Sequence, residues 1–381
     1  MRREVFIISI LMERAVATMP LDYGRCPPWL FERMKKLARG IVITIVENFG
    51  PDEFLNRLAH PAWFQSFGCV LAFDWNSSGL TTTVMAALKE ALRGLESELG
   101  IFVCGGKGKT SRKTPREIEE YGTNFTFSFT PYLIFASKIA AKVDSCLIQD
   151  GFQIYHHNFL FTKSGRWIVI QQGMNSDFQA ARRYHWLEKE KKDFIEEPHS
   201  GIASLIKVKP LNLTAKTSEE NRKISLEMVQ NNFKSLEKDL KLITPYLNNF
   251  SKEKELILPS DEIIPQPPQD LKPDNPYLKK ILFILTERKP KSYLELLFQY
   301  GVGPKTIRAL SLIGELIYGA EPSYQDPARY SFAHGGKDHI PFPVDCKTYD
   351  KTIEIMEKGI KRSNISLREK ENALRRLKEI K

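Results

Sequence analysis

The sequence lacks any run of 18 apolar residues, so it offers no transmembrane helix and we expect no membrane partner. Its five cysteines are widely spaced and contain no CxxC pair, which argues against a zinc ribbon or a redox dithiol and favours a reducing, cytoplasmic interior. The GxxxxGK[ST] phosphate loop is also absent, because Val103 stands where its first glycine belongs. We therefore expect no nucleotide cofactor.

Acidic residues are the minority, with 46 Asp and Glu against 56 Lys and Arg, and the formal net charge is +10. Such a balance favours an anionic partner such as nucleic acid, although a basic surface can also serve solubility alone. The 381 residues exceed what one hydrophobic core normally supports, so we expect two or three domains.

Changes in composition along the chain predict an α+β fold class with four segments. Residues 20–205 mix helical and strand patterns and form the expected catalytic domain, and residues 206–258 read as a helical arm. Residues 259–276 contain six prolines and suit an extended linker, and residues 277–381 form an all-α domain.

Several elements can be placed within the first segment. Helical spacing covers Trp29–Asn48 and Thr83–Leu99, and Val70–Phe73 is a candidate buried strand. Ile154–Phe161 and Trp167–Gln171 flank a polar turn that contains glycine, which predicts a β-hairpin.

A helix-hairpin-helix pattern is the sharpest signal in the chain. It consists of two glycines around one apolar residue, followed by polar and basic positions: Gly301, Val302, Gly303, Lys305, Thr306 and Arg308. Two glycines allow a tight turn whose backbone N–H groups meet a phosphate at a helix N-terminus. Such contacts bind DNA without reading base sequence. A plain turn between packed helices is the alternative.

The same pattern occurs in helix-hairpin-helix glycosylases, which carry a lysine after the turn and an aspartate further on. Lys305 and Asp345 resemble these two positions. A DNA glycosylase or abasic-site lyase that uses Lys305 and Asp345 is therefore an alternative function.

Two further basic segments suit phosphate contacts. A glycine-rich stretch, residues 104–117, carries Lys107, Lys109, Arg112 and Lys113 among hydroxyl side chains. A second segment interleaves Arg182 and Arg183 with aromatic residues, as surfaces that stack nucleic-acid bases do. A solvated loop and a packed strand or helix are the corresponding structural alternatives.

Candidate reacting groups gather around the predicted hairpin: His156, His157, His185, Gln171, Gln172 and Asp150. Imidazole, amide and carboxylate groups can hold Mg²⁺, Mn²⁺ or Zn²⁺, or one imidazole can act as a general base. Adjacent His156 and His157 should face opposite sides of a strand. We expect one of them to lie within about 10 Å of Lys107 or Lys109, because a reacting phosphate needs cations nearby. Structural histidines are the alternative.

Several strings together resemble one largely archaeal family, the domain of unknown function 763. They are residues 105–115, Tyr155-His-His-Asn-Phe-Leu-Phe161, Trp167–Met174, Ala181–Trp186 and His334-Gly-Gly-Lys-Asp338. The resemblance spans about Pro20 to Asp350 and implies no particular reaction. The glycine-loosened loop that holds His334, Lys337 and Asp338, with Asp345 beyond it, is a candidate active-site cover.

The leading expectation is a DNA-binding, DNA-processing enzyme, a metal-dependent nuclease acting in DNA repair. The alternatives are the glycosylase or lyase and a non-enzymatic repair scaffold, and an RNA-directed enzyme stays open. Oligomeric state and the identity of the metal are not determined by these patterns.

Overall fold

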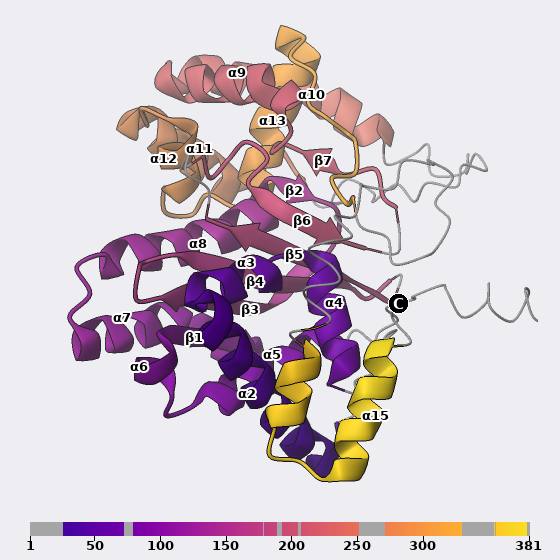
Figure 1. The fold of residues 1–381 in the computed structure, drawn as a ribbon. Coiled ribbons are helices and arrows are strands. Elements are labelled where there is room, and N and C mark those ends of the chain that lie inside the picture. Colours follow the sequence, from indigo (N-terminus) through magenta and orange to yellow (C-terminus); the bar gives the residue numbers. More distant parts are fainter. Residues whose placement is uncertain are drawn as a thin grey trace, which may run out of the picture.

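The computed structural model describes residues 26–71, 79–177, 179–188, 193–204, 207–250, 271–329, 354 and 356–378. These residues form a mixed α/β fold in which helices cover both faces of one antiparallel sheet (Figure 1). The sheet has five strands in the order β1 (Ile101–Lys107), β3 (Gln153–Thr162), β4 (Trp167–Asn175), β5 (Ala180–Leu187) and β6 (His199–Ala203). The expected mixture of helices and strands is confirmed.

One face of the sheet packs against α7 (Thr114–Phe125) and α8 (Thr130–Cys146). Alternate strand residues point into this layer because successive side chains of a strand face opposite sides. Phe102 and Phe161, for example, stack with ring centroids 4.9 Å apart. Burying each such ring contributes about 2 kcal/mol, so this layer holds the strands rigidly.

The other face packs against the N-terminal helices α2 (Pro28–Phe49), α3 (Pro51–Leu58), α4 (Pro61–Val70) and α5 (Gly79–Leu92). The intervening strand residues, such as Val103 and Leu160, belong to this second core. The C-terminal part of the chain returns to it, since residues 356–362 and α15 (Leu367–Lys378) bury Ile360 and Leu377 there. A short helix, α6 (Glu96–Leu99), leads into β1.

A second group of helices gathers at the end of the molecule opposite α15 (Figure 1). It contains α9 (Glu219–Gln230), α10 (Phe233–Phe250), α11 (Pro276–Arg288), α12 (Tyr293–Phe298) and α13 (Pro304–Tyr318). Their buried residues join the same hydrophobic cluster as α8 and the sheet. Asn221 of α9 also donates to the carbonyls of Ser311 and Ala320, at 3.0 and 2.7 Å. The described part of the helical arm expected over residues 206–258, residues 207–250, is therefore packed, and the four-segment division remains a prediction about folding units.

The element-level expectations had mixed outcomes. The helix over Trp29–Asn48 and the β3–β4 hairpin are confirmed, and the pattern over Thr83–Leu99 divides into α5 and α6. The strand over Val70–Phe73 is wrong at its start, because Val70 ends α4 and Leu71 follows in a turn. A short apolar run does not distinguish a buried strand from a buried helix. No described helix is both long and apolar enough to cross a membrane.

Candidate functional site

A row of polar residues crosses four neighbouring strands on the face that α4 and α5 cover. The strand register pairs Lys107 of β1 with His156 of β3, His156 with Gln172 of β4, and Gln172 with Arg183 of β5. Cross-strand partners share one face of a sheet and have Cα atoms about 5 Å apart. His156 therefore meets the expected separation from Lys107, and four residues distant in sequence form one polar row.

The exposed end of this row is a basic loop. Lys107 ends β1, and the 3-10 helix η1 (Gly108–Lys113) follows directly. The four cations of this loop are exposed and make no ion pair with any other residue in the described part of the chain: Lys107, Lys109, Arg112 and Lys113. Unpaired cations on a glycine-rich loop attract phosphate through long-range electrostatics.

Glycine is required where this loop begins. Gly105 has φ +90°, and a Cβ there would lie 2.1 Å from the carbonyl oxygen of His157. Glu117 of α7 accepts a hydrogen bond from the Gly105 N–H and another from the Lys89 ammonium, each at 2.7 Å. Lys89 also donates to the Gly105 carbonyl at 3.0 Å. The base of the loop is therefore fixed to α5 and α7 while its cations face solvent.

A β-bulge at Tyr155 brings a fifth residue, Tyr155 itself, to the row. The register slips between Ile154 and His156, so Tyr155 departs from strict alternation. The Tyr155 hydroxyl accepts a hydrogen bond from the Gln172 amide at 2.5 Å, and the Lys107 ammonium lies 5.8 Å from the ring centroid. Burial raises the pKa of the Tyr155 phenol, so it keeps its proton at neutral pH.

His156 lies beneath Tyr155 and Lys107 and is only 1 % exposed. Neither of its ring nitrogens has a hydrogen-bond partner among the described residues. Burial, followed by the neighbouring His157, lowers the pKa of His156 to about 3, and the charge of Lys107 adds to this shift. The side chain of Asn158 lies near enough to oppose the shift but makes no hydrogen bond of normal geometry to either nitrogen. Buried polar atoms are normally paired, so a neutral imidazole with two open nitrogens indicates a place where another group hydrogen-bonds.

The deeper part of the row is closed by Arg183 and His185. Arg183 donates from Nε to Nε2 of His185 at 2.8 Å and from its terminal nitrogens to Gln65 and Thr81. Both residues are 0 % exposed, and burial lowers the pKa of each. The sequence analysis expected Arg183 on a surface that stacks nucleic-acid bases, and its burial corrects this expectation. His185 accepts a hydrogen bond from Arg183.

His157 belongs to a different network on the α8 face. Its Nδ1 lies 2.8 Å from the Gln171 amide oxygen and its Nε2 lies 3.0 Å from the Ser137 hydroxyl, so Nδ1 carries the proton and Nε2 accepts. Gln171 donates in turn to Asp144, which also contacts His199. Each polar atom of His157 has a partner in the core, which makes this histidine structural. The expectation that His156 and His157 face opposite sides is confirmed.

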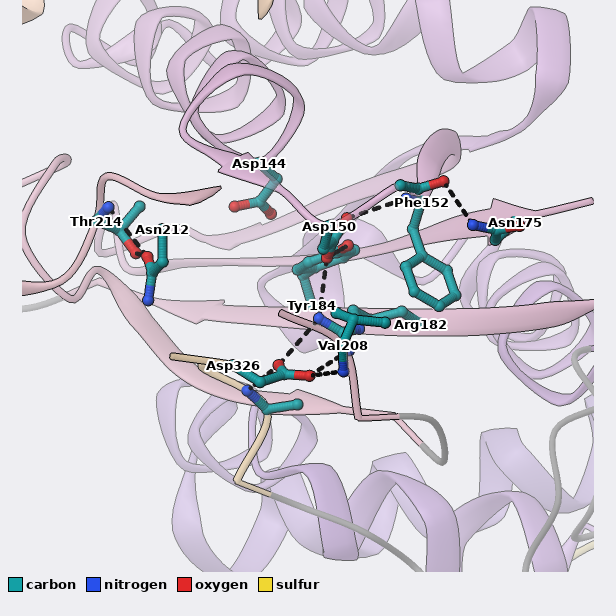
Figure 2. A network of polar contacts seen from close by, with 12 residues as sticks. Asp144, Asp150, Phe152, Asn175, Arg182, Tyr184, Val208, Asn212, Thr214 and Asp326 are labelled. Carbon is teal, nitrogen blue, oxygen red and sulfur yellow. Dashed lines mark hydrogen bonds and ion pairs between the residues drawn. The ribbon is translucent and has the colours of Figure 1, made fainter. Parts of the chain in front are cut away.

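Asp150 and Arg182 form a buried ion-pair network that Figure 2 shows. The Arg182 guanidinium lies 3.0 Å from the Asp150 carboxylate and 2.8 Å from that of Asp326, while Tyr184 donates to Asp150 at 2.6 Å. Burial raises the pKa of Asp150, and the charge of Arg182 opposes this shift. Arg182 and Asp150 are 0 % exposed and their charges are paired with each other, with Asp326 and with Tyr184. The network accounts for both side chains, so the expected roles of Arg182 on a DNA-binding surface and of Asp150 in catalysis are corrected to a structural one.

The glycine hairpin lies between α12 and α13. Gly301 has φ +83°, and a Cβ there would lie 2.2 Å from Ile281. Gly303 precedes α13 with open space around it, and Lys305 is exposed on the first turn. Thr306 and Arg308 are buried instead, so the accessible part of the expected DNA-binding set is the turn and Lys305.

The hairpin is fastened to the end of α8 and to β2 (Ile148–Gln149), which pairs with β7 (Leu211–Asn212). The Lys142 ammonium donates to the Val302 carbonyl. Gln149 donates to the Pro304 carbonyl at 2.9 Å and accepts from Arg308 at 2.7 Å. Gln149, which holds the hairpin, precedes His156 by seven residues, so at most about 25 Å of extended chain separates Gln149 from the polar row.

The remaining candidates have different outcomes. His334, Lys337, Asp338 and Asp345 lie outside the described residues. Among the residues that are described, no three histidine, cysteine, aspartate or glutamate side chains form a metal-binding group. Tyr155 and Asn158 were missed from sequence. Asn158 lies two residues beyond His156 and donates to the Cys104 carbonyl at 3.0 Å, so a period-two count from His156 identifies it, whereas the bulge at Tyr155 has no sequence signal.

The class of molecule is thus a mixed α/β protein with a basic loop beside a buried histidine and a glycine hairpin fastened to the same core. A family model described as "Protein of unknown function (DUF763)" matches residues 15–344. The match covers most of the chain, and the protein belongs to this family. No curated protein and no solved structure matches it.

Proposed function

We propose that this protein is a DNA-processing enzyme that hydrolyses a phosphodiester bond at the polar row of Lys107, Tyr155, His156 and Gln172. The observation that carries the proposal is His156, a buried imidazole with two unpartnered nitrogens directly beside a loop of four unpaired cations. Phosphodiester cleavage needs a group that accepts a proton from water and cations that stabilise charge developing on the phosphoryl oxygens.

In this proposal the loop cations bind the phosphate and His156 accepts the proton of the attacking water. The water oxygen forms a bond to phosphorus, the bond from phosphorus to the leaving sugar oxygen breaks, and that oxygen takes a proton from solvent. A bound phosphate anion favours the protonated imidazole, which counteracts the depression of the His156 pKa. The amide oxygens of Asn158 and Gln172 are the groups in this row that would hold Mg²⁺, Mn²⁺ or Zn²⁺, because the one lone-pair nitrogen of neutral His156 is needed to accept the proton.

The test uses labelled single-stranded, double-stranded, nicked and abasic oligonucleotides, each incubated with Mg²⁺, Mn²⁺, Zn²⁺ or chelator. We expect cleavage by the wild-type protein and a loss of about a hundredfold or more in His156→Asn. The matched control is His157→Gln, the same residue type on the same strand but on the opposite face. It should lower thermal stability and leave the rate per folded molecule unchanged.

Other outcomes select the alternative functions. Binding of DNA without cleavage under every metal condition would favour a repair scaffold. A covalent adduct trapped by borohydride on abasic DNA, and lost in Lys305→Ala, would favour the lyase, since Lys305 is exposed on the first turn of α13. Equal cleavage by wild type and His156→Asn would remove the polar row as the reacting site.

A further inference from the structure

Two tyrosines are exposed at the glycine hairpin. Tyr300 is 85 % exposed and directly precedes Gly301, and Tyr277 at the start of α11 is 60 % exposed. The Tyr277 hydroxyl lies 3.2 Å from the position that a Cβ on Gly301 would occupy, so Tyr277 reaches the same turn. Two aromatic side chains therefore flank one short backbone segment.

Packing does not account for Tyr300. The apolar anchors of the hairpin are its neighbours: Val302 is 3 % exposed, and Phe298 stacks on Phe135 with ring centroids 5.0 Å apart. These contacts complete the attachment of the turn to α8 without the Tyr300 ring. An aromatic side chain that lies beside the turn and faces solvent is available to contact a binding partner.

The positive charges around Tyr277 and Tyr300 indicate what kind of molecule would bind the two rings. Lys280 lies three residues after Tyr277 on α11, and Lys305 is the second residue of α13. Both lysines are exposed. Arg288 donates to Gln299, the residue before Tyr300, at 2.8 Å. Cations that alternate with exposed aromatic rings are the composition of sites that bind single-stranded nucleic acid, where phosphates meet cations and bases stack on rings.

We propose that Tyr300, with Tyr277 beside it, is a stacking platform for an unpaired DNA base next to the phosphates that the hairpin turn contacts. This inference rests on the proposed DNA-processing function and makes it more specific. The preferred substrate is then DNA that exposes unpaired nucleotides, such as a single strand, a gap or a frayed end. Continuous duplex buries its base faces by stacking them on one another, so it gains nothing from the rings.

The experiment measures binding of a labelled single strand and of the matching continuous duplex by fluorescence anisotropy, at several salt concentrations and in chelator. Tyr300→Leu keeps the size of the side chain and removes the ring, while Tyr300→Phe keeps the ring. We expect Tyr300→Leu to weaken single-strand binding by roughly tenfold without changing the salt dependence. Tyr300→Phe should retain wild-type affinity, and neither variant should change duplex binding.

Gly303→Val separates this inference from the function on which it rests. If Gly303→Val weakens both forms of DNA while Tyr300→Leu changes neither, the hairpin binds DNA and the platform is wrong. Equal weakening of single strand and duplex by Tyr300→Leu also overturns it. If no variant changes any affinity, DNA binding through the hairpin is itself wrong. Because Tyr300 is so exposed, we expect its variants to fold, which circular dichroism checks.

Discussion

At the scale of single residues, two adjacent histidines have opposite surroundings. Both ring nitrogens of His157 have partners in Ser137 and Gln171, whereas those of His156 have none among the described residues. A structural residue is paired because an unpaired buried polar group costs about 1–3 kcal/mol. The open nitrogens of His156 are thus the clearest departure from ordinary core packing on this face of the sheet.

The buried histidines predict how stability depends on pH. Burial lowers the pKa of His156 to about 3 and also lowers the pKa values of His157 and His185, whereas a histidine in an unfolded chain titrates near about 6.5. Below that pH the unfolded state binds more protons than the folded state. The stability contribution is therefore complete above pH 6.5 and is lost as pH falls toward the folded pKa values.

Urea unfolding at a series of pH values between 7.5 and 4.5 measures this effect. Each buried neutral histidine should add a slope of up to about 1.4 kcal/mol per pH unit to the free energy of unfolding. His156→Gln should reduce the total slope, and replacement of an exposed lysine, Lys113→Ala, should not. A free energy of unfolding that stays constant from pH 6.5 to 5 in the wild type would contradict neutral burial of these residues.

At the scale of elements, the glycine hairpin between α12 and α13 offers a clean test of DNA binding. Gly303 has φ −142°, a backbone conformation open to any residue, and a Cβ there meets nothing within 4 Å. Gly303→Val should fold normally and block the close approach of a phosphate to the turn. Gly301 is unsuitable, because its positive φ and the contact with Ile281 would disturb the fold.

We expect Gly303→Val to weaken DNA binding and Lys305→Ala to reduce the slope of log affinity against log salt by about one charge. Neither variant should change base preference, because phosphate contacts carry no sequence information. Titrations of two unrelated oligonucleotide sequences at several salt concentrations measure both effects. A base preference that shifts in either variant would indicate that the turn contacts base edges instead.

How far the sequence predicts these elements depends on the range of the interactions that determine them. The β3–β4 hairpin and the α2 helix follow from local periodicity and a glycine turn, so they could be predicted. The polar row could be predicted only within one strand, because the pairing of Lys107 with His156 and of Gln172 with Arg183 depends on register between distant segments. The burial of Arg182 depends on Asp326, which lies 144 residues away.

At the scale of the whole molecule, each hydrophobic core is built from segments that lie far apart in the sequence. Asp326 comes after the hairpin, and its ion pair with Arg182 ties that segment to β5, as Figure 2 shows. The cluster beneath α8 contains residues from α9 to α13, and α15 packs into the N-terminal core instead. The composition of the sequence predicted four separate segments, whereas these packing contacts and the Arg182–Asp326 ion pair connect the segments to one another.

The shared cores predict how the protein behaves when its chain is cut within the proline-rich segment of residues 259–276, which the sequence predicts to be an extended linker and therefore accessible to proteases. A protease recognition sequence inserted between residues 259 and 270 allows a single cut. The two pieces should co-elute in size-exclusion chromatography and separate only in denaturant, because the cluster beneath α8 and the Arg182–Asp326 ion pair both cross the cut.

In the cut protein, Asp326→Asn should lower the free energy of separation by about 2 kcal/mol, the usual contribution of hydrogen bonds to a charged partner. The control Asp274→Asn should have little effect, since the ion pair of Asp274 with Lys279 is exposed. Pieces that separate in plain buffer would mean that each segment completes its own core.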